Sequence, residues 1–294
     1  MENFLKIISE PDNVAIVIML LMVIFYTWWA FHQSFENDRR KRKGKPIEGE
    51  NDKKVEVWHS LVRIEMLATL VVIAVLIIWS VVLDAPLEQH SNPALTPNPA
   101  KAPWYFLGLQ EMLVYFDPWI AGVVIPGLII FGLMAIPYLD VNPKGNGYYT
   151  FSERKYSIII YCFGFLILWI FLIAIGVFAR GPGWLWFWPW EEWDHSRIVY
   201  QYNVDLTQLI GIQSRSLLGF FIGGFVISFY FGLGMILPYY YLKKRKIEFL
   251  TKLGMTRYII LIFLFLTMIG LPIKIILNLT LNVKYIWVTP WFNI

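Results

Sequence analysis

NPAKAPWYFLGLQEMLVYFDPW, residues 98–119, lies between two long apolar runs of the sequence. Pro103 suits the first position of a helix, where its missing N–H leaves no hydrogen bond unmade. No further proline occurs between Trp104 and Tyr115, so we expect a short helix that ends at Asp117-Pro118. One side of this helix carries four residues at i, i+3/i+4 spacing, namely Trp104, Leu107, Glu111 and Tyr115.

Glu111 is the only carboxylate of this expected helix. A single carboxylate among aromatic rings, between two membrane spans, is typical of a ligand pocket. The alternative is an interfacial helix whose Trp and Tyr side chains lie at headgroup level and have no further role.

The composition indicates a polytopic membrane protein. Of the 294 residues 57% are apolar and 16% are charged, and the mean hydropathy is +0.56. Backbone groups in lipid must be paired within their own segment, so we expect an all-α fold with about six transmembrane helices and one short outer-side helix. Six runs can cross a hydrocarbon core of about 30 Å: Val14–Phe31, Met66–Leu83, Ile120–Tyr138, Ser157–Phe178, Leu217–Leu242 and Tyr258–Leu281.

Most of the 25 Lys and Arg residues lie at one end of these spans. The positive-inside rule places that end in the cytoplasm, so both termini and the 104–115 helix are expected on the outer side. The alternative for the basic run 39–45 is a specific lipid or nucleic-acid site; we expect contact with membrane lipid and no nucleic acid. The cytoplasmic set is Arg39, Arg40, Lys41, Arg42, Lys43, Lys45, Lys53, Lys54, Arg63, Lys144, Arg154, Lys155, Lys243, Lys244, Arg245, Lys246, Lys252 and Arg257.

Polar segments and one charge interrupt the apolar pattern. Residues 36–60 carry no apolar period and are interpreted as a linker. Residues 180–194 are rich in Trp, which is typical of a membrane interface. The acidic cluster at 191–195 is expected to be a solvated loop. Lys274, inside the sixth span, is close enough to its outer end to reach water.

The sequence predicts no metal ligands. The four histidines, His32, His59, His90 and His195, lie outside the expected spans, so no pair can hold a haem between helices. Cys162 is the only cysteine, which excludes an intrachain disulfide and a c-type haem motif. If the chain takes part in redox chemistry, partner chains must hold the metals.

The run PWYFLGLQEML, followed by a helix that ends in IPYLD, resembles the carboxy-terminal half of cytochrome b. That half occurs as a separate chain, subunit IV, in the two-piece complexes of chloroplast type. The family pattern Pro-Glu-Trp-Tyr-Phe corresponds to residues 102–106 here, and its Pro-Phe/Tyr-Leu turn corresponds to Ile136–Leu139. The similarity covers about residues 58–180.

The whole chain resembles an enlarged bacterial variant of subunit IV. Residues 1–57 would add one transmembrane helix and a basic cytoplasmic linker. Residues 181–294 would add a Trp-rich outer loop and two more transmembrane helices.

The resemblance implies a subunit of a cytochrome bc-type quinol:cytochrome c oxidoreductase in the bacterial cytoplasmic membrane. Such complexes oxidise membrane quinol at an outer site and release protons there. One electron passes to a Rieske iron–sulfur protein and on to a c-type cytochrome; the other passes through two haems b, on a four-helix cytochrome b subunit, to an inner quinone site. These three proteins are the expected partners in a dimeric complex, and quinol is the only cofactor that this chain would bind.

The resemblance assigns quinol binding to the start of the expected 104–115 helix, which we call the motif helix. The residues are Pro103, Trp104, Tyr105 and Phe106. The family has a Glu where this chain has Pro103, and that Glu is thought to accept a quinol proton. We therefore predict that Glu111 and Tyr105 carry the proton chemistry, since burial of Glu111 favours its protonated form. Eight residues, about 12 Å of helix, separate positions 103 and 111, so the quinol binds deeper, or Tyr105 or water bridges the gap.

Two further alternatives follow from the resemblance. Arg63 and Glu65, a few residues after His59, stand near the position of a family Lys-Asp pair at the inner quinone site. They could instead form a salt-bridged helix start. The substitution at Pro103 also leaves open a non-catalytic role, as an anchoring or assembly subunit of a respiratory redox complex.

Overall fold

The computed structural model describes residues 2–50, 56–84, 90, 92–144, 149–245 and 248–294. Within these residues, six helical stretches are long and apolar enough to cross a membrane, which confirms the predicted all-α, membrane-spanning fold. They are built from α2 (Pro11–Arg42), α3 (Val62–Val82), α5 (Ile125–Leu139), α6 (Phe151–Cys162) with α7 (Phe171–Phe178), α8 (Leu217–Lys244) and α10 (Met255–Leu281). The shorter helices are α1 (Glu2–Ser9), α4 (Trp104–Met112) and α9 (Glu248–Leu253).

Short π-helical segments extend three of the spans without breaking them. Val57–Leu61 leads into α3, Ile120–Val124 leads into α5, and Phe163–Ile170 joins α6 to α7. The segment before α5 has a direct cause, because Pro126 has no N–H to close a regular helical turn. Each span therefore remains continuous in spite of the irregular turn.

The first span is longer than the sequence predicted. Helix α2 continues past Phe31 to Arg42, so the expected linker 36–60 begins inside a helix. Glu36 lies 3.9 Å from Arg39 and 3.8 Å from Arg40, and the basic last turn suits the negative end of the helix dipole. The expectation that the histidines lie outside the spans is therefore wrong for His32, which is in α2, and for His59, which is in Val57–Leu61.

The basic end of α2 is fastened to the start of α6. Asp38 accepts hydrogen bonds from the backbone N–H of Ser152 (2.9 Å) and from its hydroxyl (2.8 Å). A carboxylate from another helix thus caps the first turn of α6, where N–H groups have no partner within the helix. Asn37 adds a bond from its side-chain amide to the carbonyl of Tyr149 at 3.0 Å. Helix α2 therefore belongs to the same packed unit as α6.

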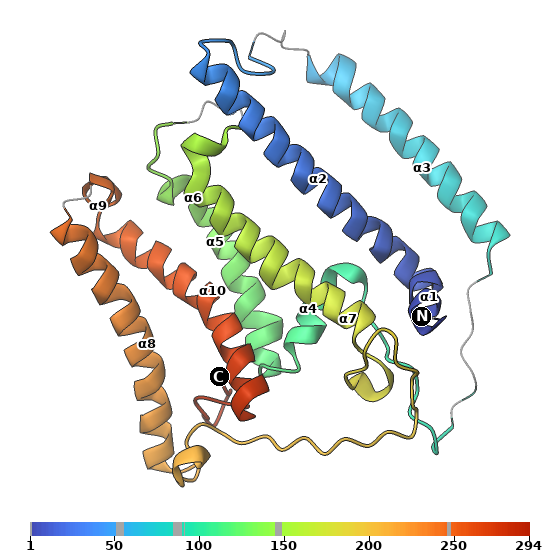
Figure 1. The fold of residues 1–294 in the computed structure, drawn as a ribbon, viewed down its shortest axis with the longest axis vertical. Helices are drawn as coiled ribbons and strands as arrows, with labels where there is room; N and C mark the ends of the chain where they lie inside the picture. The colour runs from blue at the N-terminus through green and yellow to red at the C-terminus, as the bar shows by residue number, and fades with distance from the viewer. Residues whose placement is uncertain (1, 51–55, 85–89, 91, 145–148, 246–247) are drawn as a thin grey trace.

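Figure 1 shows where the spans lie in the bundle. Helices α5, α6, α7 and α10 lie in the middle, α3 stands at one edge and α8 at the other. No residue of α3 is buried. An extended segment at about 190–216 runs along one end of the bundle from the α7 side to α8.

We call the end of the bundle that holds α4 the motif end. Both chain termini lie at this end, where the ring of Phe4 packs 5.9 Å from that of Phe178. The basic segments lie at the opposite end, around the carboxyl ends of α2 and α8. Of the basic residues used to predict the orientation, Lys53, Lys54 and Lys246 lie outside the described residues.

Candidate functional site

Helix α4 begins directly after Pro103, which adopts extended dihedrals (φ −50°, ψ 148°). Pro103 is therefore the residue before the first helical position, one place earlier than predicted. The side-chain amide of Gln110, further along α4, holds the residues that lead into the helix. Its oxygen accepts a hydrogen bond from the N–H of Ala102 (2.8 Å), and its nitrogen donates one to the carbonyl of Ala100 (2.9 Å). The start of α4 is thus held in place by its own helix.

Close packing on α7 positions the second turn of α4. Leu107 is fully buried, and a Cβ atom added at Gly176 would lie 2.9 Å from its Cγ atom. A Cβ atom at position 176 would force Leu107 to shift, so the small residue lets the two helices approach closely. Leu107 shares its core cluster with Ile173, Val177 and, from α2, Ile16.

Glu111, one turn further along α4, is bound by Arg180. The Nε atom of Arg180 donates to one carboxylate oxygen at 2.9 Å and its Nη2 atom donates to the other at 2.5 Å. The hydroxyl of Tyr115 donates to the same carboxylate at 3.1 Å. All three side chains are buried, with exposed fractions of 0% for Glu111, 3% for Tyr115 and 6% for Arg180. A bidentate, charge-assisted pair of this kind is among the strongest polar contacts in proteins.

Arg180 reaches Glu111 because of the turn that follows α7. Its Nη1 atom donates to the carbonyl of Trp184 at 3.1 Å, and its guanidinium lies 5.6 Å from the ring centre of Trp186. Trp184 adopts a left-handed φ of 58°, directly after Gly183 at 65°. Tryptophan rarely takes this conformation, so the surrounding contacts must maintain it.

The electrostatics of this group favour one protonation pattern. Burial lowers the pKa of Arg180, but the hydrogen bond and charge of Glu111 outweigh that effect and raise it overall. Burial, followed by the charge of Glu111, raises the pKa of Tyr115 to about 12. The guanidinium therefore stays charged, and the Tyr115 hydroxyl keeps the proton that it donates.

The predicted surroundings of Glu111 were partly wrong. Leu107 and Tyr115 are buried on its side of α4, as expected, but Trp104 is 42% exposed and does not cover it. Arg180 was not predicted as a partner of Glu111. The signal that could have revealed it is chemical, because a buried carboxylate requires a partner, and Arg180 is the first basic residue after the span Ser157–Phe178.

The predicted quinol-binding rings form a separate face at the start of α4. Trp104, Tyr105 and Phe106 are 42%, 48% and 53% exposed. The ring of Tyr105 lies 5.6 Å from that of Trp104 and 4.8 Å from that of Phe106. Within the described part of the chain, no hydrogen bond joins Tyr105 to Glu111. The structure therefore brings the three rings together but places the carboxylate on the α7 side of the helix.

The residues predicted for an inner quinone site lie at the start of α3. Arg63 and Glu65 are both exposed. Among the described residues, no ion pair joins them; at this helix start the ring of His59 lies 3.9 Å from the carboxylate of Glu56. The structure therefore shows no salt bridge between Arg63 and Glu65 at the start of α3.

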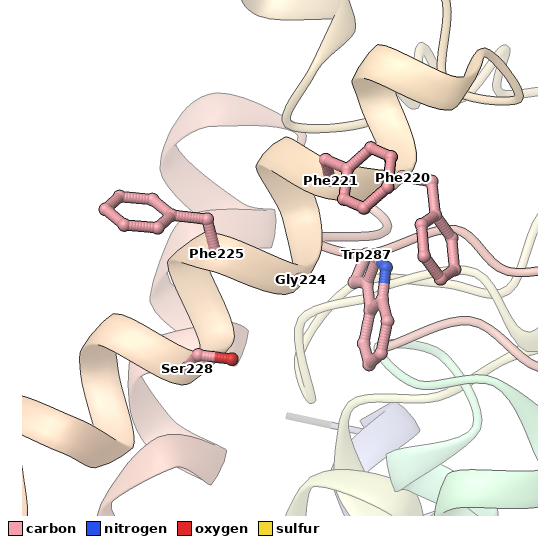
Figure 2. Close-up of a pocket in the computed structure, with 6 residues that line it drawn as sticks. All are labelled: Phe220, Phe221, Gly224, Phe225, Ser228 and Trp287. Carbon is pink, nitrogen blue, oxygen red and sulfur yellow. The ribbon is translucent and has the colours of Figure 1, made fainter.

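Two hollows in the surface lie outside this group. The first, of about 530 Å³, lies between α8 and the segment after α10 (Figure 2). Phe220 and Trp287 lie side by side there and Phe225 points the other way. The second, of about 680 Å³, is lined by Trp119, Val124 and residues 290–292. Neither lining includes a titratable group, and no cluster of His, Cys, Asp or Glu in the described residues could hold a metal ion.

Comparison with known proteins identifies the stretch that contains this site. Residues 90–185 match the family Cytochrome b(C-terminal)/b6/petD, whereas searches of curated proteins and of solved structures found no match. The matched stretch contains α4, α5, α6, α7 and Arg180; it begins after α3 rather than at residue 58. The predicted resemblance is confirmed for this stretch: residues 90–185 are similar to the cytochrome b C-terminal, subunit IV type of domain.

Proposed function

We propose that this chain is the subunit IV-type membrane subunit of a cytochrome bc-type complex and forms one wall of an outer quinol-oxidising site. The observation that supports the proposal is the arrangement of α4 within the matched stretch. Its first turn exposes three successive aromatic rings, and its next turn is anchored to Arg180 by a buried ion pair. A rigid helix with exposed rings at the end of a membrane bundle suits a flat, apolar ligand.

In this proposal Trp104, Tyr105 and Phe106 contact the quinol ring, and Pro103 holds the helix entry without any acid–base role. Glu111 accepts a quinol proton only when Arg180 releases one of its two oxygens. The alternative is that the Glu111–Arg180 pair acts solely to hold α4 against the turn after α7. In that case the proton acceptor belongs to another subunit.

The redox centres of the complex are proposed on partner chains. These are a four-helix cytochrome b subunit with two haems b, a Rieske iron–sulfur protein and a c-type cytochrome, in a dimeric complex. The motif end would face the outer side of a bacterial cytoplasmic membrane. Arg63 and Glu65 would lie at the opposite, inner face, where Glu65 relays protons toward an inner quinone site.

The proposal is tested by purifying the tagged chain gently from its native membrane and measuring haem absorbance, subunit composition and oxidation of a soluble quinol. We expect b-type haem absorbance and co-purified partner subunits. Tyr105→Leu should lower the turnover about tenfold or more, because it removes a ring from the proposed wall. Tyr200→Leu is the matched control, since Tyr200 is 91% exposed in the segment after α7. Full quinol oxidation without b-haem absorbance would contradict the proposal.

A second function is favoured by two specific observations. Pro103 occupies the position of the family acid, and the nearest buried carboxylate is already bound by Arg180. A subunit that only anchors or assembles a respiratory redox complex would show both features. It would co-purify with haem-bearing partners, and Tyr105→Leu would leave their quinol turnover unchanged.

A further inference from the structure

Lys274 of α10 lies outside the matched stretch and is 3% exposed. The prediction that this ammonium group reaches water is therefore wrong. No carboxylate forms an ion pair with Lys274 among the residues described. A buried charge in a membrane span is unfavourable unless it is bound by polar groups, so its partners indicate what it does.

Two backbone carbonyls bind the Lys274 ammonium. The Nζ atom donates to the carbonyl of Tyr115 at 2.9 Å and to that of Lys284 at 2.5 Å, and it lies 5.4 Å from the ring centre of Phe116. Tyr115 lies beyond the last residue of α4, and Lys284 beyond the last residue of α10. Carbonyls at such positions are not paired within their own helix and require an outside donor. The Nζ atom of Lys274 thus connects α10 with the segment after α4 and with the segment after α10.

Tyr115 connects this contact to the candidate site. Lys274 fixes its backbone, and its hydroxyl donates to Glu111, which binds Arg180. The same segment has a second contact with the carboxy-terminal part of the chain, from the Asn293 side-chain amide to Asp117 at 3.3 Å. Apolar side chains of α10 also pack on the cluster that contains Tyr115, namely Leu271 and Ile275.

We propose that Lys274 is a positioning residue: through the backbone of Tyr115 it sets the position of the Glu111–Arg180 pair. The carboxy-terminal helices would thereby fix the geometry of a site that lies wholly within the family domain. The consequence for quinol oxidation depends on the proposed function, whereas the positional coupling does not.

The test is a double-mutant cycle on the thermal unfolding of the full chain, purified in detergent. Tyr115→Phe removes only the hydroxyl that reaches Glu111, and Lys274→Met removes only the ammonium. Tyr115→Phe should lower Tm by about 2–4 °C in the wild-type background. It should lower Tm by less than half as much in Lys274→Met, because there the hydroxyl is no longer held on the carboxylate. Lys274→Arg, which keeps a cationic donor, should restore the full shift.

Lys284→Met is the matched control. Its side chain takes no part in the contact with Tyr115, while its backbone carbonyl remains, so Tyr115→Phe should shift Tm as in the wild type. If Lys274→Met does not fold, Asn293→Ala replaces it and should also reduce the Tyr115→Phe shift. Equal shifts in every background would overturn the inference. No quinol is present in this measurement, so its failure and a failure of the proposed quinol oxidation are distinguishable.

Discussion

Glu111 and Arg180 are each buried with the other as charged partner, so substitution of one leaves the other uncompensated. Breaking a buried pair from one side costs about 3–5 kcal/mol, whereas removing both charges is far less destabilising. Glu111→Gln should therefore lower the stability of the chain strongly, and Glu111→Gln with Arg180→Gln should recover much of it. Thermal unfolding of the purified chain in detergent measures both effects.

The double variant also separates a catalytic from a structural role of Glu111. If Glu111 accepts a quinol proton, the folded double variant, with its haems present, should oxidise quinol more slowly by a factor on the order of 10²–10⁴. Wild-type turnover in that variant would end the acceptor hypothesis. The pair would then serve only to hold α4 in place.

Helix α4 depends on its close approach to α7. A methyl group at position 176 would lie 2.9 Å from the Cγ atom of Leu107, which is itself fully buried and cannot move freely. We expect Gly176→Ala to destabilise the chain by about 1–3 kcal/mol, as overpacking of a tight core does. Displacement of α4 should also shift the aromatic rings of its first turn.

Gly232→Ala, in α8, is the matched control for this prediction. Nothing lies within 4 Å of a Cβ atom built at Gly232, and alanine favours a helix more than glycine does. Its stability should equal or exceed that of the wild type in the same thermal-unfolding measurement. Equal losses in both variants would show that the α4–α7 approach is not the sensitive feature.

Across the whole molecule, the basic residues and the motif helix lie at opposite ends of the spans. The positive-inside rule predicts that the basic end lies in the cytoplasm. In a Cys162→Ala background, a cysteine at Tyr200 should react with an impermeant thiol reagent in intact cells. A cysteine at Pro46 should react only after the membrane is opened. Both positions are exposed, so the reverse labelling pattern would refute the orientation.

The sequence by itself determined the spans, the short helix at Trp104 and the resemblance of the middle region to the cytochrome b C-terminal family. These are local properties, since the length of an apolar run decides whether it can cross a bilayer. The sequence predicted the ends of the helices less accurately. Helix α2 continues to Arg42 because ion pairs and contacts with α6 stabilise a polar stretch that has no apolar period.

Only the tertiary structure decided which buried polar groups meet. Asp38 binds Ser152 across 114 residues, Glu111 binds Arg180 across 69, and Lys274 binds Tyr115 across 159. A buried charge predicts that some partner exists, but its identity depends on which helices pack together and at what height along their axes. Spacing along the chain carries no information on that packing, so the residues that hold the candidate site in place emerged only from the fold.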